Sequence, residues 1–453
     1  MYNNGLIDLH HQVQGQLWVD RLNDAHARGQ LCPWVSTFHT RNLACELEGT
    51  FYHGSFNAGV KMVFGDGEAW MVRFPRVGKV HDKYADEKVA MEVRALRLLR
   101  ERTTIPVPMV RAWGSAADNT LGLGPFIMMD FIHGACLNDL LIDPNEADPT
   151  RLIREDACDG DIEVIYRQMA NFMLQIFDLD FESDRSKGFA TTTEYFEYLL
   201  GQDFQQLNHQ PNSVYGPNDA KSRYLALKVL ASLLPEFINK TYDKGKFKLI
   251  CDDLGLANLI VRSEHDLTVV GVVDLEWSYT GPAQLFGSAP WWLLQDRPVN
   301  EEWEWHDGKP PALAKRYDKH LEMYKRVLTE EEAKMPGHEA KQLSTLVEWS
   351  QISGAMWLHM LLSVGFNDHR SFPFTQLRQH IGEKEWSRRL AAIASCPEVG
   401  EFVTRKTSML QEYEAAVDAL EEDKALLDRS GMTREAFLAK TLPTATSYLL
   451  NRH

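Results

Sequence analysis

Apolar and polar residues alternate at every second position on both sides of a Gly-Asp-Gly turn at 65–67. A period of two is typical of a β-strand with one buried face, and two such runs around a short turn predict a hairpin. We therefore expect two neighbouring strands of one antiparallel sheet. Their apolar face would consist of Val60, Met62, Phe64, Trp70, Val72 and Phe74.

The hydrophobic period then changes to that of a helix. In residues 86–102 the apolar side chains recur three or four positions apart, which predicts a helix with one buried stripe. The sequence Ile-Pro-Val-Pro at 105–108 stops this helix, because proline removes a backbone donor and clashes with the preceding turn. Two strand-like pieces follow at 109–115 and 124–132, and Gly134 breaks the pattern.

The rest of the chain has mainly helical patterns around one short β region. Residues 135–245 are mostly helical in pattern, and short strands are expected within 247–274. Helical patterns return from about residue 310, most clearly at 343–364 and 408–427.

These elements predict an α+β fold with two lobes. A small antiparallel-sheet lobe with one main helix would span 1–132, and a larger, mainly helical lobe would span 133–453. A hinge at about 129–134 would join them. Ligand pockets favour such boundaries between domains, so a nucleotide is a natural occupant of the cleft.

Composition narrows the class of protein. The 453-residue chain has a net charge of -16, and an acidic protein repels a phosphate backbone, so we expect no nucleic-acid partner. Its six cysteines are scattered without a Cys-x-x-Cys pair, which argues against a zinc site or a disulfide framework. The N-terminus lacks the pattern of a signal peptide, and no apolar run approaches the roughly 18 residues of a membrane span. We expect a soluble, cytoplasmic protein.

Asp253 and Asn258 stand five residues apart after a predicted strand. In phosphoryl transfer, an Asp takes the proton of the attacking hydroxyl, and an Asn at this spacing binds Mg²⁺ through its amide oxygen. The spacing alone is a weak signal, because Asp and Asn are common in turns. Asp274 ends an apolar run and is a second candidate ligand for Mg²⁺, with a solvated turn acid as an equal alternative.

A cation and an acid in the predicted small lobe have complementary positions. Arg73 stands between Val72 and Phe74, so it points to the opposite face of the sheet, and Glu92 lies 19 residues later in the predicted helix. A strand cation paired with a helix Glu holds the α- and β-phosphates in kinase-like lobes. The alternatives are a surface Glu92 paired with Lys88, and an Arg73 that extends from an edge strand into solvent.

The turn at 54–57 precedes the first strand of the hairpin. It contains Ser55 and Asn57, and its small, turn-forming residues could bring backbone N–H groups close to phosphate oxygens. The glycine-rich motif of many nucleotide-binding loops is absent here, so this signal is weak.

In order and spacing, these elements resemble the aminoglycoside phosphotransferase and choline kinase branch of the protein-kinase-like fold. More narrowly, the chain resembles the fungal phosphotransferase-family proteins. The resemblance covers roughly residues 45–380. It implies that Asp253 is the catalytic base, that Asn258 and Asp274 bind Mg²⁺, and that Arg73 with Glu92 serves the phosphates of ATP.

The resemblance also implies a hinge in which the Asp130 carbonyl and the Ile132 N–H meet the adenine edge. Three positions depart from the family pattern. Cys251 replaces a histidine, Asp252 replaces a glycine, and Arg73 replaces a lysine. An arginine stays charged and binds phosphate, but its planar fork is not equivalent to an ammonium group. A cysteine nucleophile at 251 is a minor alternative, since no histidine is near it in the sequence.

The expected activity is an ATP- and Mg²⁺-dependent transfer of the γ-phosphate to a hydroxyl of a small molecule, with an aminoglycoside-, choline- or sugar-like acceptor. The segment 301–308 interleaves acids with tryptophans, which suits an ammonium ligand, although packing of these tryptophans on the lobe is the favoured interpretation. Trp291 and Trp292 are expected in the core. The alternative function is a pseudokinase that binds a nucleotide or a partner without transfer, which the departures at Arg73 and Cys251 and the missing glycine-rich motif favour.

Overall fold

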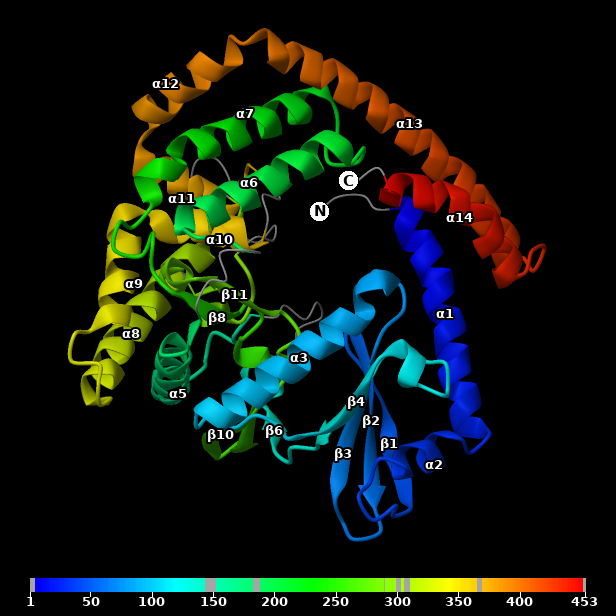
Figure 1. Cartoon of the computed structure of the whole chain (residues 1–453). Coiled ribbons are helices and arrows are strands. Elements are labelled where there is room, and N and C mark those ends of the chain that lie inside the picture. Colours follow the sequence, from blue (N-terminus) through cyan, green and yellow to red (C-terminus); the bar gives the residue numbers. More distant parts are fainter. Residues whose placement is uncertain are drawn as a thin grey trace.

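The structure is a computed structural model of the 453-residue chain. It describes residues 5–142, 152–181, 188–288, 290–298, 303–304, 310–364 and 369–450. A small lobe built on an antiparallel sheet lies beside a larger, mainly helical lobe, and residues 131–134 lead from one to the other (Figure 1). The chain therefore has the predicted α+β, two-lobed architecture of the protein-kinase-like fold.

The small lobe contains one five-stranded antiparallel sheet in the order β1-β2-β3-β5-β4. The predicted hairpin is confirmed as β2 and β3, with Val60 opposite Val72. Since β3 is the middle strand of the five, Arg73 occupies the centre of the sheet and not an edge. The strands are β1 (Cys45–His53), β2 (Asn57–Phe64), β3 (Ala69–Pro75), β4 (Val110–Gly114) and β5 (Phe126–Asp130).

Helix α3 (Asp82–Arg102) is the predicted main helix of this lobe. It begins at Asp82 and not at residue 86, because the side chain of His81 accepts a hydrogen bond of 3.2 Å from the N–H of Lys83 and caps the first turn. Its buried stripe contains Val89 and Val93, and also the charged residues Lys88 and Glu92. Burial of two charges on a helix requires partners for both.

Two helices before the sheet, α1 (Gly5–Ala27) and α2 (Leu31–Ser36), were not anticipated from the pattern. They cover the apolar face of the hairpin. The indole of Trp18 donates a 2.9 Å hydrogen bond to the Leu123 carbonyl, and the ring of Trp34 lies 4.8 Å from that of Phe126. The face that carries Arg73 is left for the cleft.

Two small sheets of the larger lobe lie next to the cleft. Because β8 ends at Cys251 and β9 begins at Leu259, the loop 252–258 connects one sheet to the other. Gly134 lets the segment between the lobes pack on β9, because a Cβ there would lie 2.3 Å from the Val261 carbonyl oxygen. The orders are β10-β9-β6 and β11-β8-β7, from β6 (Ala135–Cys136), β7 (Asp180–Phe181), β8 (Phe247–Cys251), β9 (Leu259–Ser263), β10 (Asp266–Val272) and β11 (Ser278–Pro282).

Helices make up the rest of the larger lobe. The segment 343–364, expected as one helix, is two helices, α9 and α10. They are separated by Gly354, which has φ +79° and lies against the ring of His380. The helices are α4 (Leu137–Leu141), α5 (Asp159–Phe177), α6 (Thr192–His209), α7 (Pro217–Leu233), α8 (Ala312–Lys334), α9 (Gln342–Ser353), α10 (Ala355–Val364), α11 (Phe372–Ile381), α12 (Glu383–Ala394), α13 (Pro397–Asp428) and α14 (Arg434–Leu450). None of the helices described is long and apolar enough to cross a membrane.

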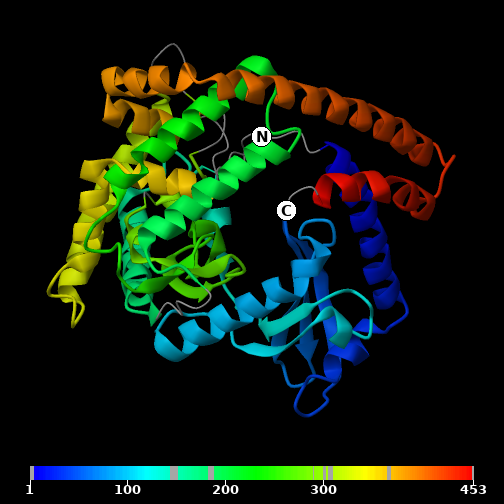
Figure 2. The ribbon, with the colours of Figure 1, turned by 45° about the horizontal axis from the view of Figure 1, so that its top comes forward.

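The last two helices return to the small lobe. Helix α13 leaves the larger lobe as a long arm, and α14 turns back against α1 (Figures 1 and 2). We call the contact of α13 and α14 with α1 the C-terminal brace. Its apolar cluster consists of Val13 from α1, Tyr413, Val417 and Leu420 from α13, and Phe437 from α14. The brace thus connects the lobes at a second place, away from residues 131–134.

Candidate functional site

A cleft of about 1090 Å³ lies between the two lobes. Eight of the nine residues predicted for the site line it, and the ninth, Glu92, is buried behind Arg73. The eight come from the turn before β2, from β3, from the end of β5, and from the loops that follow β8 and β10. They are Ser55, Asn57, Arg73, Asp130, Ile132, Asp253, Asn258 and Asp274.

Arg73 joins the two walls of this cleft. Its guanidinium donates one hydrogen bond to the Glu92 carboxylate on α3 and another, of 3.0 Å, from Nη1 to Oδ1 of Asp274 in the larger lobe. Burial lowers the pKa of Arg73, but the carboxylates of Glu92 and Asp274 outweigh this effect and raise the pKa above its ordinary value. The guanidinium is therefore a permanent, fixed cation. Glu92 is paired with Arg73 and not with Lys88.

Lys88 has a different partner, which the sequence did not indicate. Its ammonium group pairs with Glu276, two residues after Asp274. The same Glu276 oxygen accepts a 2.6 Å hydrogen bond from Asn57 Nδ2, and Lys88 Nζ donates to Asn57 Oδ1 at 3.2 Å. These contacts hold the turn at 54–57 against the larger lobe. The acid two residues after Asp274 was visible in the sequence. Its pairing with a lysine 188 positions away could not be predicted from local spacing.

The turn itself has a defined shape. The Gly54 N–H donates a 2.9 Å hydrogen bond to the Asn57 carbonyl, and the Arg76 side chain donates one of 2.8 Å to the Gly54 carbonyl. Phe56 packs edge-on against Trp277 of the larger lobe, with ring centroids 5.4 Å apart. Both ends of the Asn57 side chain are engaged within the protein, so this turn can offer a phosphate its backbone and Ser55.

The loop between β8 and β9 presents Asp253 to the cleft. Asn258 donates from Nδ2 to the Asp253 carbonyl at 2.8 Å and lies 3.4 Å from Asp253 Oδ2, which closes the five-residue spacing into a compact turn. The Val273 N–H donates to the Asn258 carbonyl at 3.0 Å, so the next residue, Asp274, lies beside this loop. Burial raises the pKa of Asp253, and the nearby Arg297 opposes this rise. Asn258 and Asp274 thus place an amide and a carboxylate on one wall beside Asp253, oxygen ligands of the kind that fit Mg²⁺.

The two neighbours of Asp253 have different surroundings. Asp252 turns its carboxylate toward α10, where Oδ1 accepts a 2.6 Å hydrogen bond from the Ser363 hydroxyl. Burial raises its pKa. Burial also raises the pKa of the Cys251 thiol, to about 11. A thiol whose pKa is raised is a poor nucleophile at neutral pH, which argues against a cysteine mechanism.

Arg297 and Trp291 lie beside Asp253, and neither was predicted to belong to the site. Arg297 Nη2 is 3.3 Å from Asp253 Oδ1, and the guanidinium lies over the Trp291 ring, 4.4 Å from its centroid. The expectation of a core position holds for Trp292, which is 4% exposed, but is incomplete for Trp291, whose indole lines the cleft. Arg297 follows a region without a clear periodic pattern, and only the fold brings it to the loop.

The predicted hinge forms one end of the cleft. The Asp130 N–H donates to the Met109 carbonyl at 3.0 Å, and the Asp130 carboxylate pairs with Arg111. The side chain of Ile132 packs on Gly271 of β10, where a Cβ would lie 2.7 Å from Ile132 Cδ1. The Ile132 N–H makes no hydrogen bond within the described part of the chain. This end of the cleft is lined largely by backbone and apolar side chains.

The acidic and aromatic segment 301–308 is described only at Trp303 and Glu304. Trp303 is fully buried, with its ring 5.2 Å from Phe372 and 5.8 Å from Tyr317. For Trp303, packing on the lobe is therefore confirmed. The remaining residues, Glu301, Glu302, Trp305 and Asp307, lie outside the described residues.

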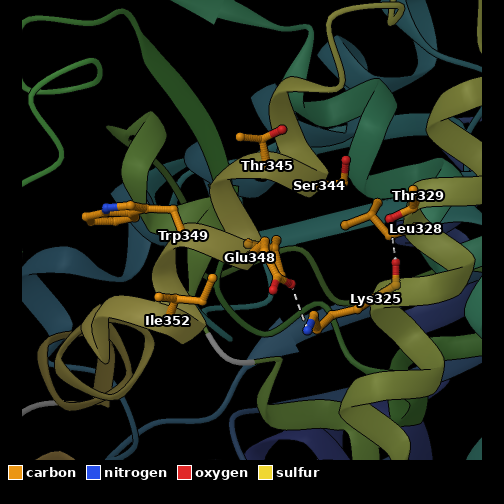
Figure 3. Close-up of a pocket in the computed structure, with 9 residues that line it drawn as sticks. Lys325, Leu328, Thr329, Ser344, Thr345, Glu348, Trp349 and Ile352 are labelled. Atoms are coloured by element: carbon orange, nitrogen blue, oxygen red, sulfur yellow. Dashed lines mark hydrogen bonds and ion pairs between the residues drawn. The ribbon is translucent and has the colours of Figure 1, made fainter. Parts of the chain in front are cut away.

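A second hollow, of about 490 Å³, lies between α8 and α9 (Figure 3). Lys325 and Glu348 form a 2.7 Å ion pair across it, and Trp349 and Ile352 lie on the same side (Figure 3). It contains none of the predicted site residues. Its one ammonium and one carboxylate neutralise each other, so the cleft between the lobes is the stronger candidate for chemistry.

No family model matches the chain, and no curated protein matches it. Solved structures with a similar arrangement include aminoglycoside phosphotransferase APH(2'')-Ib bound to ADP, at 12% identity and a TM-score of 0.42, covering 77% of this chain and 93% of that one. A microcompartment-associated aminopropanol kinase is similar at 17% identity and a TM-score of 0.40, covering 80% and 94%. A protein described as a putative fructosamine-3-kinase from Thermobifida fusca is similar at 13% identity and 0.39, covering 82% and 98%. These values are too low to argue activity. The fold assignment rests on the lobes and sheets described above, and it is a protein-kinase-like fold.

Proposed function

We propose that the protein is an ATP- and Mg²⁺-dependent phosphotransferase that moves the γ-phosphate to a hydroxyl group of a small molecule. The observation that carries this proposal is the meeting of Asp253, Asn258, Asp274 and Arg73 in one cleft, although they are spread over 201 residues. Their convergence is what phosphoryl transfer needs, because that reaction depends mainly on positioning and on charge stabilisation.

The roles follow from position and chemistry. Asp253 accepts the proton of the acceptor hydroxyl while the acceptor oxygen forms its bond to the γ-phosphorus. The bond from that phosphorus to the β–γ bridging oxygen breaks, and its electron pair stays on ADP. Asn258 and Asp274 would hold Mg²⁺, which neutralises charge on the phosphates when bound. Arg73, positioned by Glu92, would contact the α- and β-phosphates.

The remaining predicted residues would bind the two ends of the nucleotide. Ser55 and the backbone of the turn at 54–57 line the cleft and would contact the phosphates. The Ile132 N–H and the Asp130 carbonyl would meet the adenine. For the acceptor, an aminoglycoside, a choline-like amino alcohol or a sugar is proposed. Asp139 and Asp296, cleft aspartates without an assigned role in binding ATP or Mg²⁺, favour a cationic one.

A pseudokinase is the second candidate, and two contacts favour it. Asn57 is held by Lys88 and Glu276, and Asp253 is in contact with Arg297, so two expected site residues are already engaged within the protein. The lobe boundary at residues 132 and 133 and a cytoplasmic location stay predictions.

The test combines binding with turnover. We expect ATP with Mg²⁺ to raise the melting temperature, and ADP to be released with at least one of a panel of aminoglycosides, amino alcohols and sugars. Asp274→Asn should raise the Mg²⁺ concentration that both signals require, because it removes a charged ligand. Asp266→Asn, an exposed acid on β10 of the same lobe, is the matched control. A melting temperature shift without turnover across the panel would favour the pseudokinase, and no shift at all would refute both candidates.

A further inference from the structure

Arg297 occupies a position that the proposed roles do not use. Only two basic residues line the described part of the cleft, Arg73 and Arg297. Arg73 pairs with Glu92 and Asp274 and is assigned to the α- and β-phosphates. The loop that carries the proposed base has the sequence Asp-Leu-Gly-Leu-Ala-Asn, with no cation of its own. Arg297 is therefore the one described cation on the Asp253 side of the cleft.

The guanidinium is held in place by aromatic and backbone contacts. It stacks on Trp291, and Nη2 donates to the Asp252 carbonyl at 3.1 Å. The Trp291 indole N–H donates to the same carbonyl at 3.1 Å. Gly255 makes room for this ring, since a Cβ there would lie 2.5 Å from the Trp291 ring. A charge fixed before the reaction stabilises developing charge without further reorganisation.

Part of the guanidinium is left unused. Nη2 contacts the Asp252 carbonyl and Asp253 Oδ1, while Nε and Nη1 have no hydrogen-bond partner among the described residues. The Arg297 side chain is 26% exposed, and it lines the cleft. An arginine has five N–H donors in a rigid fork that matches phosphate oxygens, so three donors are not used by the described residues and face a ligand site next to Asp253.

We infer that Arg297 is a catalytic cation of the proposed transfer. Through Nη2 it orients the Asp253 carboxylate, and through Nε and Nη1 it contacts the phosphoryl group in transit. The inference rests on the proposed function. No further bond forms or breaks and no further proton moves, because an arginine stays protonated throughout and acts only through its charge and its N–H groups.

The test compares binding of a ground state with binding of a transition-state mimic. The affinity for ADP with Mg²⁺ is measured with and without fluoroaluminate, which mimics a transferring phosphoryl group, in wild type, Arg297→Ala, Arg297→Gln and Arg297→Lys. We expect Arg297→Ala to bind ADP nearly as wild type does, but to lose most of the tightening by fluoroaluminate. Arg297→Gln keeps donors without charge and should behave similarly. Arg297→Lys should fall between Arg297→Ala and wild type.

The second measurement is the rate of ATP consumption. Arg297→Ala should lose about 10²–10³-fold in rate, the usual effect of removing one fixed donor, and added guanidinium ion should restore part of it. Arg262→Ala, at an exposed arginine on β9, is the control and should show neither loss nor rescue. Unfolding curves exclude a loss of fold.

Three results would overturn the inference or its basis. Equal tightening by fluoroaluminate in wild type and Arg297→Ala would refute it, as would a change confined to the KM of the acceptor. A higher rate after removal of Arg297 would show an inhibitory contact in its place. If wild type binds no ADP with Mg²⁺, the proposed function itself fails, and this outcome is distinct from the others.

Discussion

Two of the places where the lobes meet are built from different chemistry. Across the cleft, the lobes make ionic, directional contacts: Arg73 with Asp274, and Lys88 and Asn57 with Glu276. At the C-terminal brace, the contact is an apolar cluster around Phe437. Ionic hydrogen bonds fix distances and angles, whereas apolar packing tolerates small changes of shape. The cleft contacts therefore set the geometry of the site, and the brace adds an apolar attachment between the lobes.

The polar contacts of the brace support this contrast. His10 Nδ1 and the Thr441 hydroxyl are 2.9 Å apart, and Arg434 pairs with Asp20. The Arg434–Asp20 pair is at least 41% exposed on each side, so solvent screens it, and we expect it to contribute little. We therefore expect a mutation in the cleft to change activity first, and a mutation in the brace to change stability first.

The largest expected effect on the rate distinguishes Asp253 from its neighbour Asp252. Asp253→Asn removes the proposed base and should lower the rate of phosphoryl transfer by about 10²–10⁴-fold. The unfolding free energy and the affinity for ATP should stay close to wild type. Asp252→Asn is the matched control, because this side chain faces Ser363, and it should keep most of the rate. Equal rates in Asp253→Asn and wild type would contradict the assignment of the base.

The next effect comes from the buried pair of Lys88 and Glu276. Lys88→Met leaves the Glu276 carboxylate buried without its cation and should cost about 3–5 kcal/mol in unfolding free energy. The double variant Lys88→Met, Glu276→Met should regain much of this loss, yet still bind ATP more weakly, since Asn57 loses both of its partners. Urea unfolding and ATP titration measure the two quantities.

A matched control for that pair is Lys325→Met, which removes a pair with Glu348 at a more exposed position. It should cost less than about 1 kcal/mol. If all three variants were equally stable, the ionic contacts would not set the geometry of the cleft.

The brace is tested by Phe437→Ala. Phe437 is fully buried, and its truncation should cost about 3 kcal/mol locally, near the low end for such a change, because its apolar cluster is small. Hydrogen exchange should speed up in α14 and α1, while the rate of ATP consumption changes less than about twofold. Leu442→Ala, at a 54% exposed position of the same helix, should leave exchange unchanged. A loss of activity as large as that of Asp253→Asn would erase the contrast between the two regions.

The last expected effect is a pH dependence where α13 leaves the larger lobe. Lys406 is fully buried, its ammonium group donates to the Gln210 carbonyl, and burial lowers its pKa to about 7. Between pH 7 and about 10 the unfolded chain keeps a proton here that the folded chain has lost. Because stability rises with pH wherever the unfolded state binds more protons, this residue adds stability as the pH increases.

We expect the unfolding free energy of wild type to gain on that of Lys406→Met as the pH rises from 6 to 9. The comparison with the variant removes the contribution of other titrating groups. A difference between the two proteins that does not change with pH would show that Lys406 stays charged in the folded state.

The sequence predicted the cleft better than the brace, for a physical reason. Asp253 and Asn258 are five residues apart, and Arg73 and Glu92 belong to a strand and a helix that follow each other, so local periodicity and spacing indicated them. Glu276 and Arg297 contact residues that are far away in the chain, and no local sequence pattern predicts such contacts. Helix α1 was missed because it buries Trp18 against the sheet and Val13 against the brace, which leaves no clean polar face.

The division of 343–364 into two helices was missed for a similar reason. Gly354 within an apolar, helical pattern costs little in isolation, and only its packing against His380 favours a break. Trp291 was assigned to the core from its apolar neighbours. Its position at the cleft depends on the contact between the loop 252–258 and the segment 290–297, which the sequence does not show.

The brace has a mechanical consequence. A body attached to another through one short strip of chain can swing and twist about that strip in several ways. The small lobe is attached at residues 131–134, through an apolar core shared between α3 and the larger lobe, and again through α14. We expect these separate attachments to restrict swinging and twisting of the small lobe, so that the cleft opens over a narrow range.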